Sequence, residues 1–475
     1  MLFNSYIFLL FLVLVIPTYR ILKGRSRTFF LLACSYFFYG YWDWRFCSLL
    51  LISTVADFLI GQRLFAATDD RLRKRFLWLS MGINLGILGF FKYFNFFVDS
   101  FEPMVQSLGG HLDFLHLNII LPVGISFYTF QTMSYTIDIY RKRIEPTRDF
   151  WSFALFVAFF PQLVAGPIER AADLLPRLEK LGLPTREQFR QGMALIVTGM
   201  FKKVMLGDTT GRLVDPIFAQ SELYRSDELL FGLFLFSIQI YADFSGYSSI
   251  ARGLAKLLGV ELMHNFQQPY LSSNITEFWR RWHISLSSWL KDYLYISLGG
   301  NRQGTFRTHI NLMTTMLLGG LWHGSNWTFV IWGGLHGTYL ILHKLLLKGA
   351  KPTTHFEYQN AGQLGKYVLK VVATFLLVLL TWLFFRAEGL GQALEVLSSF
   401  VHWETGEFSG RLLKIALAFL VVTMAIDIAE YYTKKHTFLL KVPNGIRQGI
   451  MVSMALITLL YLFQAKPLPF VYFQF

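Results

Sequence analysis

The feature that most constrains this chain is the recurrence of long apolar runs separated by short polar stretches. A helix needs about 20 apolar residues to cross the hydrocarbon core of a bilayer. The runs lie near residues 2–19, 28–42, 46–62, 76–98, 117–140, 151–165, 191–206, 229–250, 309–321, 326–347, 367–385, 412–430 and 447–464. Because helices satisfy their own backbone hydrogen bonds in lipid, the pattern predicts an all-α polytopic membrane protein with roughly a dozen spans.

Composition supports lipid as the surroundings of this chain and argues against nucleic acid as a partner. Charged residues make up 16% of the 475 residues, whereas soluble proteins carry about 25%. The formal net charge of +14 comes from short basic clusters between apolar runs, a pattern typical of membrane orientation. Two cysteines, Cys34 and Cys47, imply neither a disulfide framework nor a metal knuckle.

Basic loops predict the orientation of the first half. The loops 20–27, 63–75 and 141–148 are rich in Lys and Arg and alternate with other loops, so they fall on one side, the cytoplasm. The loop 99–116 has no Lys or Arg, which fits the outer side. The N-terminus is therefore predicted to face outward. Its apolar run lacks a basic start and a cleavage site, and is interpreted as a retained first membrane helix.

Two polar stretches interrupt the spans. Residues 165–190 contain three prolines and many charges, which predicts a loop partly embedded in the protein. Residues 348–366 are polar and are predicted to be a connector. With no internal repeat, the sequence predicts one membrane domain over residues 1–475, with its informative motifs between 120 and 340 and less informative helices over 350–475.

The first functional candidate is His323, in the stretch MLLGGLWHGSNW. A polar side chain at the end of an apolar run is costly and therefore a functional candidate. Imidazole moves protons near neutral pH, and the surrounding glycines allow a substrate or a neighbouring helix to approach closely. Trp322 stands beside it as possible catalytic support. The alternative is a histidine at the membrane interface, where Trp also gathers.

The second candidate region runs over residues 277–302. Large apolar residues recur there at helical spacing, which predicts one amphipathic helix lying at the interface or dipping into the core. His283 lies one turn from Trp279 on this helix. Arg280, Arg281 and Lys291 could hold the phosphates of an acyl donor, or they could form a solvated cationic face drawn to anionic lipid.

A third candidate is the stretch QIYADFSGYSS, with Tyr241 and Asp243. An intramembrane carboxylate needs a partner. Asp243 could orient a catalytic histidine, or it could be a structural hydrogen-bond hub; both interpretations stay open. No set of His, Cys or carboxylates has convincing zinc spacing, so no metal site is predicted.

Between about Ile120 and His336 the sequence resembles the membrane-bound O-acyltransferase (MBOAT) family, within it most closely the membrane subunit of bacterial alginate O-acetylation. The resemblance is carried by LPVGISFYTFQTMSYTIDIYR from Leu121, AGPIER from Ala165, YADFSGYS from Tyr241, NFQQPYLSSNITEFWRRWHISLSSWLKDYLYISLGGNR from Asn265 and LLGGLWHGSNW from Leu317. It implies a ring of tilted helices, with re-entrant or interfacial helices, around a central funnel. The family's near-invariant histidine matches His323, and its second functional position matches His283.

The resemblance also implies a reaction. A cytoplasmic thioester, acetyl-CoA, would donate an acetyl group for O-acetylation of an extracytoplasmic polysaccharide, an alginate-like exopolysaccharide, at the bacterial inner membrane. No tightly bound cofactor is needed. His323 would act as the base, and His283 would polarise or position the carbonyl. Related systems hand the acetyl group to an exported serine enzyme of the SGNH type, which is the expected protein partner.

Other interpretations stay open. The acceptor could be peptidoglycan, cellulose or teichoic acid. A non-catalytic transporter of acyl groups would usually show paired repeats, which this sequence lacks. A structural scaffold would tolerate loss of both histidines.

Overall fold

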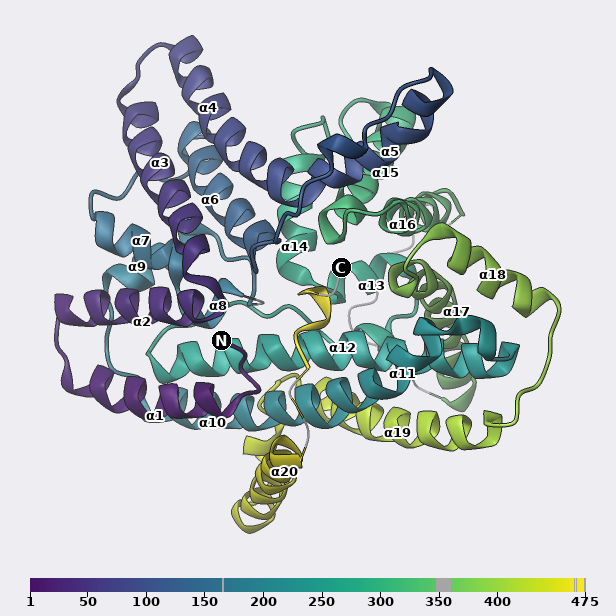
Figure 1. Cartoon of the computed structure of the whole chain (residues 1–475). Coiled ribbons are helices and arrows are strands. Elements are labelled where there is room, and N and C mark those ends of the chain that lie inside the picture. Colours follow the sequence, from purple (N-terminus) through teal and green to yellow (C-terminus); the bar gives the residue numbers. More distant parts are fainter. Residues whose placement is uncertain (165, 347–359, 465, 467, 474–475) are drawn as a thin grey trace. The chain divides into compact units, whose positions relative to one another are not determined.

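The computed structural model describes residues 1–164, 166–346, 360–464, 466 and 468–473, and over these the chain forms helices and no strand (Figure 1). Most of the predicted connector 348–366, and Ala165 at the start of the AGPIER motif, lie outside the described residues. The chain divides into two compact units. The first comprises residues 1–193 with 251–263, and the second comprises residues 194–250 with 264–475.

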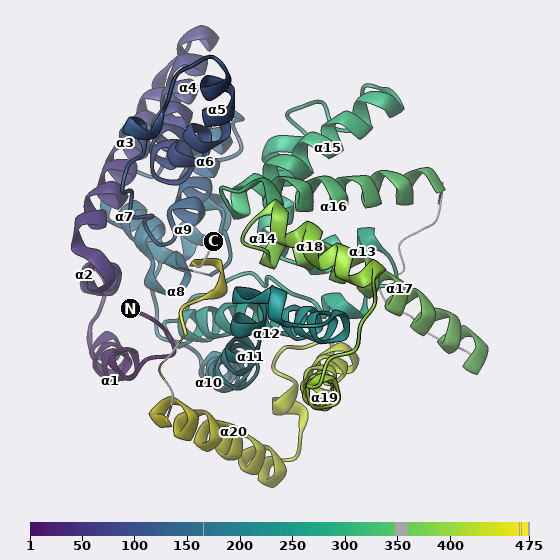
Figure 2. The same ribbon diagram turned by 45° about the vertical axis from the view of Figure 1, so that its right-hand side comes forward.

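The first unit is built mostly from the N-terminal helices. They are α1 (Tyr6–Ile21), α2 (Arg25–Asp43), α3 (Cys47–Ala66), α4 (Asp70–Leu88), α5 (Phe94–Ser107), α6 (Ile125–Tyr140), α7 (Phe150–Ala158), α8 (Phe160–Leu163), α9 (Ala171–Glu179) and the first part of α10 (Arg186–Phe201). Helices α3, α4 and α6 pack against one another (Figure 2).

A buried polar network joins these three helices. Asp57 on α3 accepts hydrogen bonds from the Ser80 hydroxyl at 2.6 Å and from the Asn84 amide at 2.8 Å, both on α4. On α6, the Thr132 hydroxyl donates to the Asn84 side-chain oxygen at 3.0 Å, and the Thr136 hydroxyl lies 2.9 Å from that of Ser80. Hydrogen-bonded polar groups can be buried at low cost, so this network fixes the packing of the three helices.

The second unit contains the remaining helices. They are the end of α10, the π-helix η4 (Lys202–Asp208), α11 (Thr209–Ala219), most of α12 (Ser226–Leu257), α13 (Ile275–Arg281), α14 (Ile284–Trp289), the π-helix η7 (Leu290–Tyr295), α15 (Gly304–His323), α16 (Trp327–Leu346), α17 (Ala361–Arg386), α18 (Leu390–Val401), α19 (Ser409–Thr433) and α20 (Asn444–Gln464).

Helices α15 and α16 form a close antiparallel pair (Figure 1). A Cβ on Gly320 would collide with the carbonyl of Phe329, and one on Gly333 would collide with the carbonyl of Met316. Only glycine at both positions lets the two backbones approach this closely. The glycines beside His323 therefore serve helix packing, one of the roles that the sequence predicted.

The described residues support a multi-pass membrane protein. Six helical stretches among them are long and apolar enough to cross a membrane: 25–66, 70–107, 226–257, 361–386, 409–433 and 444–464. Apolar side chains on them also face outward: on α20, Leu456 is 54% exposed, Leu460 60% and Phe463 72%. Water would penalise such a surface whereas lipid favours it. The count of roughly a dozen spans, and the single domain over 1–475, stay predictions.

Two sequence-based expectations were wrong in detail. The amphipathic helix expected over residues 277–302 is not continuous, because the chain breaks between α13 and α14 at Trp282 and His283. The apolar residues at helical spacing pack inside the protein on both sides of the break. The loop expected over 165–190 contains the helix α9, in which Leu174 and Leu178 are fully buried.

Candidate active site

His323 is the last residue of α15 and lies inside an aromatic shell. Its side chain is buried. The ring centroids of Trp332, Tyr472 and Phe385 lie 5.0, 5.3 and 5.4 Å from that of the imidazole. These residues come from α16, the end of the chain and α17, so three separate segments enclose the histidine.

His283 lies in the break between α13 and α14 with a left-handed backbone, φ +43° and ψ 55°. Few residues other than glycine adopt this conformation, and it costs about 1–3 kcal/mol. Backbone hydrogen bonds on both sides hold it in place: the Ile284 N–H donates to the Asn265 carbonyl at 2.9 Å, and the Gln267 N–H donates to the Arg281 carbonyl at 3.0 Å. Strain maintained by the surrounding structure is typical of functional positions.

The structure brings the two histidines together. Their ring centroids are 6.3 Å apart, with the ring planes at 63° to each other. Trp322 packs against both, with centroids 5.9 Å from His283 and 5.1 Å from His323. Phe244 packs edge-on against His283 at 4.6 Å. Burial lowers the pKa of His283 to about 3, so this imidazole is neutral at pH 7.

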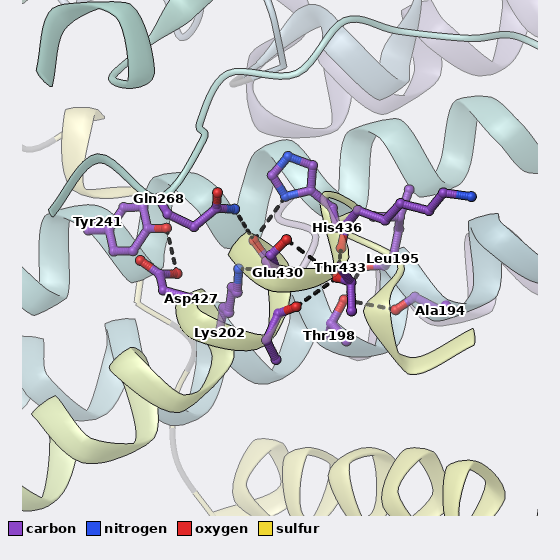
Figure 3. A network of polar contacts seen from close by, with 12 residues as sticks. Ala194, Leu195, Thr198, Lys202, Tyr241, Gln268, Asp427, Glu430, Thr433 and His436 are labelled. Atoms are coloured by element: carbon purple, nitrogen blue, oxygen red, sulfur yellow. Dashed lines mark hydrogen bonds and ion pairs between the residues drawn. The ribbon is translucent and has the colours of Figure 1, made fainter. Parts of the chain in front are cut away.

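Tyr241 belongs to a buried polar network that links α12 to α19 (Figure 3). Its hydroxyl donates to Asp427 at 2.8 Å. Nearby, the Lys202 ammonium lies 2.7 Å from Glu430, which also accepts from the Gln268 amide at 2.9 Å. We call this set the Lys202 network: Lys202, Tyr241, Gln268, Asp427, Glu430 and His436. The contacts of the Tyr241 hydroxyl therefore lead to α19 and not to the histidine rings.

Asp243 belongs to a second ion cluster, which we call the Lys203 cluster (Lys203, Asp208 and Asp243). The Lys203 ammonium lies 2.6 Å from both carboxylates. Asp243 also accepts the backbone N–H of Val471 at 2.6 Å. Of the two roles left open for Asp243, these contacts favour a hydrogen-bond hub.

The basic residues proposed for the donor lie in different environments. Arg280 and Lys291 are exposed. Arg281 is buried, pairs with Glu277 at 2.6 Å and lies over the Tyr431 ring at 5.6 Å. Arg281 therefore stabilises α13, whereas the side chains of Arg280 and Lys291 are not enclosed by the protein.

Several residues around the histidines were not predicted from the sequence. Phe385 and Tyr472 lie beyond residue 350, in the part that the motifs left uninformative, although both contact the His323 ring. Lys202 and Lys203 were not predicted either. Two adjacent lysines inside the apolar run 191–206 were a usable signal, because a charge within a span needs a buried partner. In the part of the chain that the structure describes, no group of three His, Cys, Asp or Glu residues could hold a metal ion.

These features define a helical, multi-pass membrane protein with a buried pair of histidines. The profile of the MBOAT family, the membrane-bound O-acyltransferase family, matches residues 140–385. That range contains both histidines and covers more than half of the chain. The protein belongs to the membrane-bound O-acyltransferase family and is an O-acyltransferase.

Similarity to known proteins extends beyond the residues that the family profile matches. The chain is 42% identical over 449 residues to the probable alginate O-acetylase of Azotobacter vinelandii, covering 92% of this chain and 87% of that protein. It is 34% identical over 435 residues to the peptidoglycan O-acetyltransferase of Helicobacter pylori, covering 84% and 80%. It is 27% identical over 281 residues to the teichoic acid D-alanyltransferase of Streptococcus thermophilus, covering 55% of this chain and 64% of that protein.

Proposed function

We propose that this protein is an O-acetyltransferase of the bacterial cytoplasmic membrane that passes an acetyl group from a cytoplasmic thioester toward an extracytoplasmic polysaccharide. The observation that carries the proposal is the meeting of His323 and His283, 40 positions apart in the sequence, inside one buried aromatic shell. An alginate-like exopolysaccharide is the proposed polymer, because similarity to probable alginate O-acetylases extends over most of both chains.

The histidines would divide the chemistry between them. His323 takes the proton of the acceptor hydroxyl as the new C–O bond forms, and the C–S bond to the donor breaks with its electron pair leaving on sulfur. His283, neutral at pH 7, donates a hydrogen bond to the carbonyl oxygen where negative charge develops. The proton held by His323 then returns to the departing thiolate. The surrounding Trp and Phe rings keep water from the thioester.

The donor and the immediate acceptor complete the proposal. Acetyl-CoA is the proposed donor, and the exposed Arg280 and Lys291 are its proposed phosphate contacts. An exported serine enzyme of the SGNH type would receive the acetyl group and modify the polymer. The Lys- and Arg-rich loops support an N-terminus outside the cytoplasm.

Peptidoglycan is the second candidate polymer, favoured by the similarity to the Helicobacter pylori peptidoglycan O-acetyltransferase. The polysaccharide and the peptidoglycan occur in separable fractions of the cell envelope, so one measurement distinguishes them.

The experiment complements a deletion strain with wild type, His323→Ala, His283→Ala and the control His343→Ala. His343 contacts Thr276 and lies outside the histidine pair. At matched membrane levels, base-releasable acetate is measured in exopolysaccharide, peptidoglycan and lipid-linked glycans. We expect His323→Ala to lower acetate in one fraction at least about 100-fold, the scale of general acid–base catalysis, and His343→Ala to restore it. Full acetylation by His323→Ala would reject the assignment.

A further inference from the structure

Residues 470–472 are buried in the second unit, next to the aromatic shell of His323. We call residues 468–472 the C-terminal segment. Phe470 is 0% exposed and Val471 1%. Backbone groups buried in this way need hydrogen-bond partners, so specific contacts are expected to hold the segment.

The Lys203 cluster supplies those contacts through the backbone of the segment. The Val471 N–H donates to Asp243 Oδ2 at 2.6 Å, and Lys203 Nζ donates to the Pro469 carbonyl at 3.4 Å. Lys203 is 1% exposed and Asp243 2%. One buried lysine and one buried carboxylate therefore bind one carbonyl and one N–H of the same short segment.

The charges of the cluster explain why a backbone donor suits it. When ionised, Asp208 and Asp243 carry two negative charges against one positive charge on Lys203. A buried carboxylate is stabilised by each further hydrogen bond it accepts, and the Val471 N–H provides one. Because these contacts are made to main-chain atoms, they fix the position of the segment whatever side chains it carries.

The side chains of the C-terminal segment complete the aromatic shell around the histidines. The Tyr472 ring lies 5.3 Å from His323, 4.9 Å from Phe244 and 5.7 Å from Phe385. The Phe470 ring lies 5.2 Å from Phe244, which itself packs on His283. Displacement of the segment would therefore open the aromatic shell next to both imidazoles.

We propose that Lys203 and Asp243 are positioning residues of the acyltransferase site, which hold the C-terminal segment by its backbone so that Tyr472 packs against His323. The effect on catalysis rests on the proposed function, because opening the aromatic shell would slow acetyl transfer only if the histidines carry out that transfer. The anchoring itself can be measured without any activity.

The first experiment measures anchoring. A single cysteine replaces Val471 in a Cys34→Ala, Cys47→Ala background, and its reaction with a maleimide is followed in detergent-solubilised protein. We expect slow labelling that accelerates at least about tenfold with Lys203→Gln or Asp243→Asn, because breaking the contacts frees the segment locally. Lys203→Arg should retain most of the protection. Lys202→Gln is the matched control: it changes the adjacent buried lysine, whose ion pair is with Glu430.

A second cysteine separates local release from general loosening. Ala393 on α18 is 0% exposed, and Ala393→Cys should stay unreactive in the same variants. If that cysteine also reacts, the second unit has opened as a whole. In that case Val471→Pro tests the anchoring instead, because it removes the donated N–H and leaves the side chains of the Lys203 cluster unchanged.

The second experiment measures acetate transfer in the complemented strain. We expect Val471→Pro to lower transfer at least about tenfold, whereas Val471→Ala, which retains the N–H, keeps most of it. Unchanged labelling with Lys203→Gln and Asp243→Asn, or full transfer by Val471→Pro, would overturn the inference. Accelerated labelling together with full activity of His323→Ala would instead reject the proposed function and leave the anchoring intact.

Discussion

Buried carboxylates in the two units show two different kinds of contact. In the first unit, Asp57 is surrounded by the hydroxyl of Ser80 and the amide of Asn84, which are neutral donors. In the second unit, Glu430 and Asp243 lie 2.7 and 2.6 Å from lysine ammonium groups. The first arrangement joins adjacent helices of a local bundle. The second joins segments 228 positions apart, as between Lys202 and Glu430.

The difference teaches what each kind of contact contributes. Buried ion pairs contribute little net stability against apolar replacements, yet removal of one partner is strongly destabilising. Their main contribution is therefore to favour one arrangement of distant segments over others, and their contribution to the net free energy of unfolding is smaller. Neutral hydrogen bonds suffice where neighbouring helices already pack together. In the second unit, where α12 contacts both α19 and the C-terminal segment, buried ion pairs help to hold these distant segments together.

The largest expected effect comes from removing one half of an ion pair. Lys202→Met should lower the free energy of unfolding by about 3–5 kcal/mol, because Glu430 keeps a buried charge without its ammonium partner. Lys202→Met with Glu430→Leu should recover much of that loss. Thermal unfolding in detergent measures both. A double variant as unstable as the single one would show that Gln268 and His436 still require the carboxylate.

A smaller effect is expected from pH, at Glu169 in the first unit. Burial raises the pKa of Glu169 to about 7, an effect opposed by the Met263 N–H and by Arg177 and Arg252, while Asp173 adds to it. The folded state therefore favours the protonated form, and stability is lost as pH rises from the unfolded pKa, near 4.5, through 7. Between pH 5 and 8 the loss should be about 2–3 kcal/mol.

Glu169→Gln provides the matched test of that pH dependence. It cannot ionise, so its thermal midpoint should fall less between pH 5 and 8 than that of the wild type. Parallel curves for the two proteins would exclude ionisation of Glu169 as the cause.

Tyr241→Phe should lower the free energy of unfolding by about 2 kcal/mol, because Asp427 loses a buried donor 2.8 Å away. Tyr270→Phe is a suitable comparison, since the Tyr270 hydroxyl donates to the Ser237 carbonyl and not to a carboxylate. We expect the smaller loss for Tyr270→Phe. Equal losses would mean that the charge of the acceptor makes no difference in this unit.

The smallest effect is expected for Asp57→Asn, a loss of about 1 kcal/mol. The hydroxyl of Ser80 can still donate to the asparagine oxygen, so most of the network persists. Asp57→Leu should cost more, because Ser80 and Asn84 would lose their acceptor. If Asp57→Asn destabilises as much as Lys202→Met, then the negative charge of Asp57 is itself required, and the contrast between the units is wrong.

The sequence predicted the helical membrane fold, both histidines and the close packing at the glycines, because apolar run length and intramembrane polarity are local signals. It did not predict the break at His283. The tryptophans on both sides keep a helical spacing, whereas the left-handed backbone depends on a hydrogen bond accepted by the Asn265 carbonyl and one donated by the Gln267 N–H. Nor could it place Tyr472 beside His323, because that contact depends on Lys203 and Asp243, hundreds of positions away. The proposed roles of both histidines stay predictions.

Lys203 reaches Asp208, five positions further along the chain, because the seven residues 202–208 form the π-helix η4. A π-helix holds more residues in each turn than an α-helix. In ordinary α-helical geometry each position rotates the chain by about 100°, so positions five apart point about 140° away from each other. Lys203 and Asp208 therefore face each other only because the backbone of η4 is wound more widely. A single residue inserted between them should disrupt the Lys203 cluster more than a substitution of one of the apolar residues that lie between them.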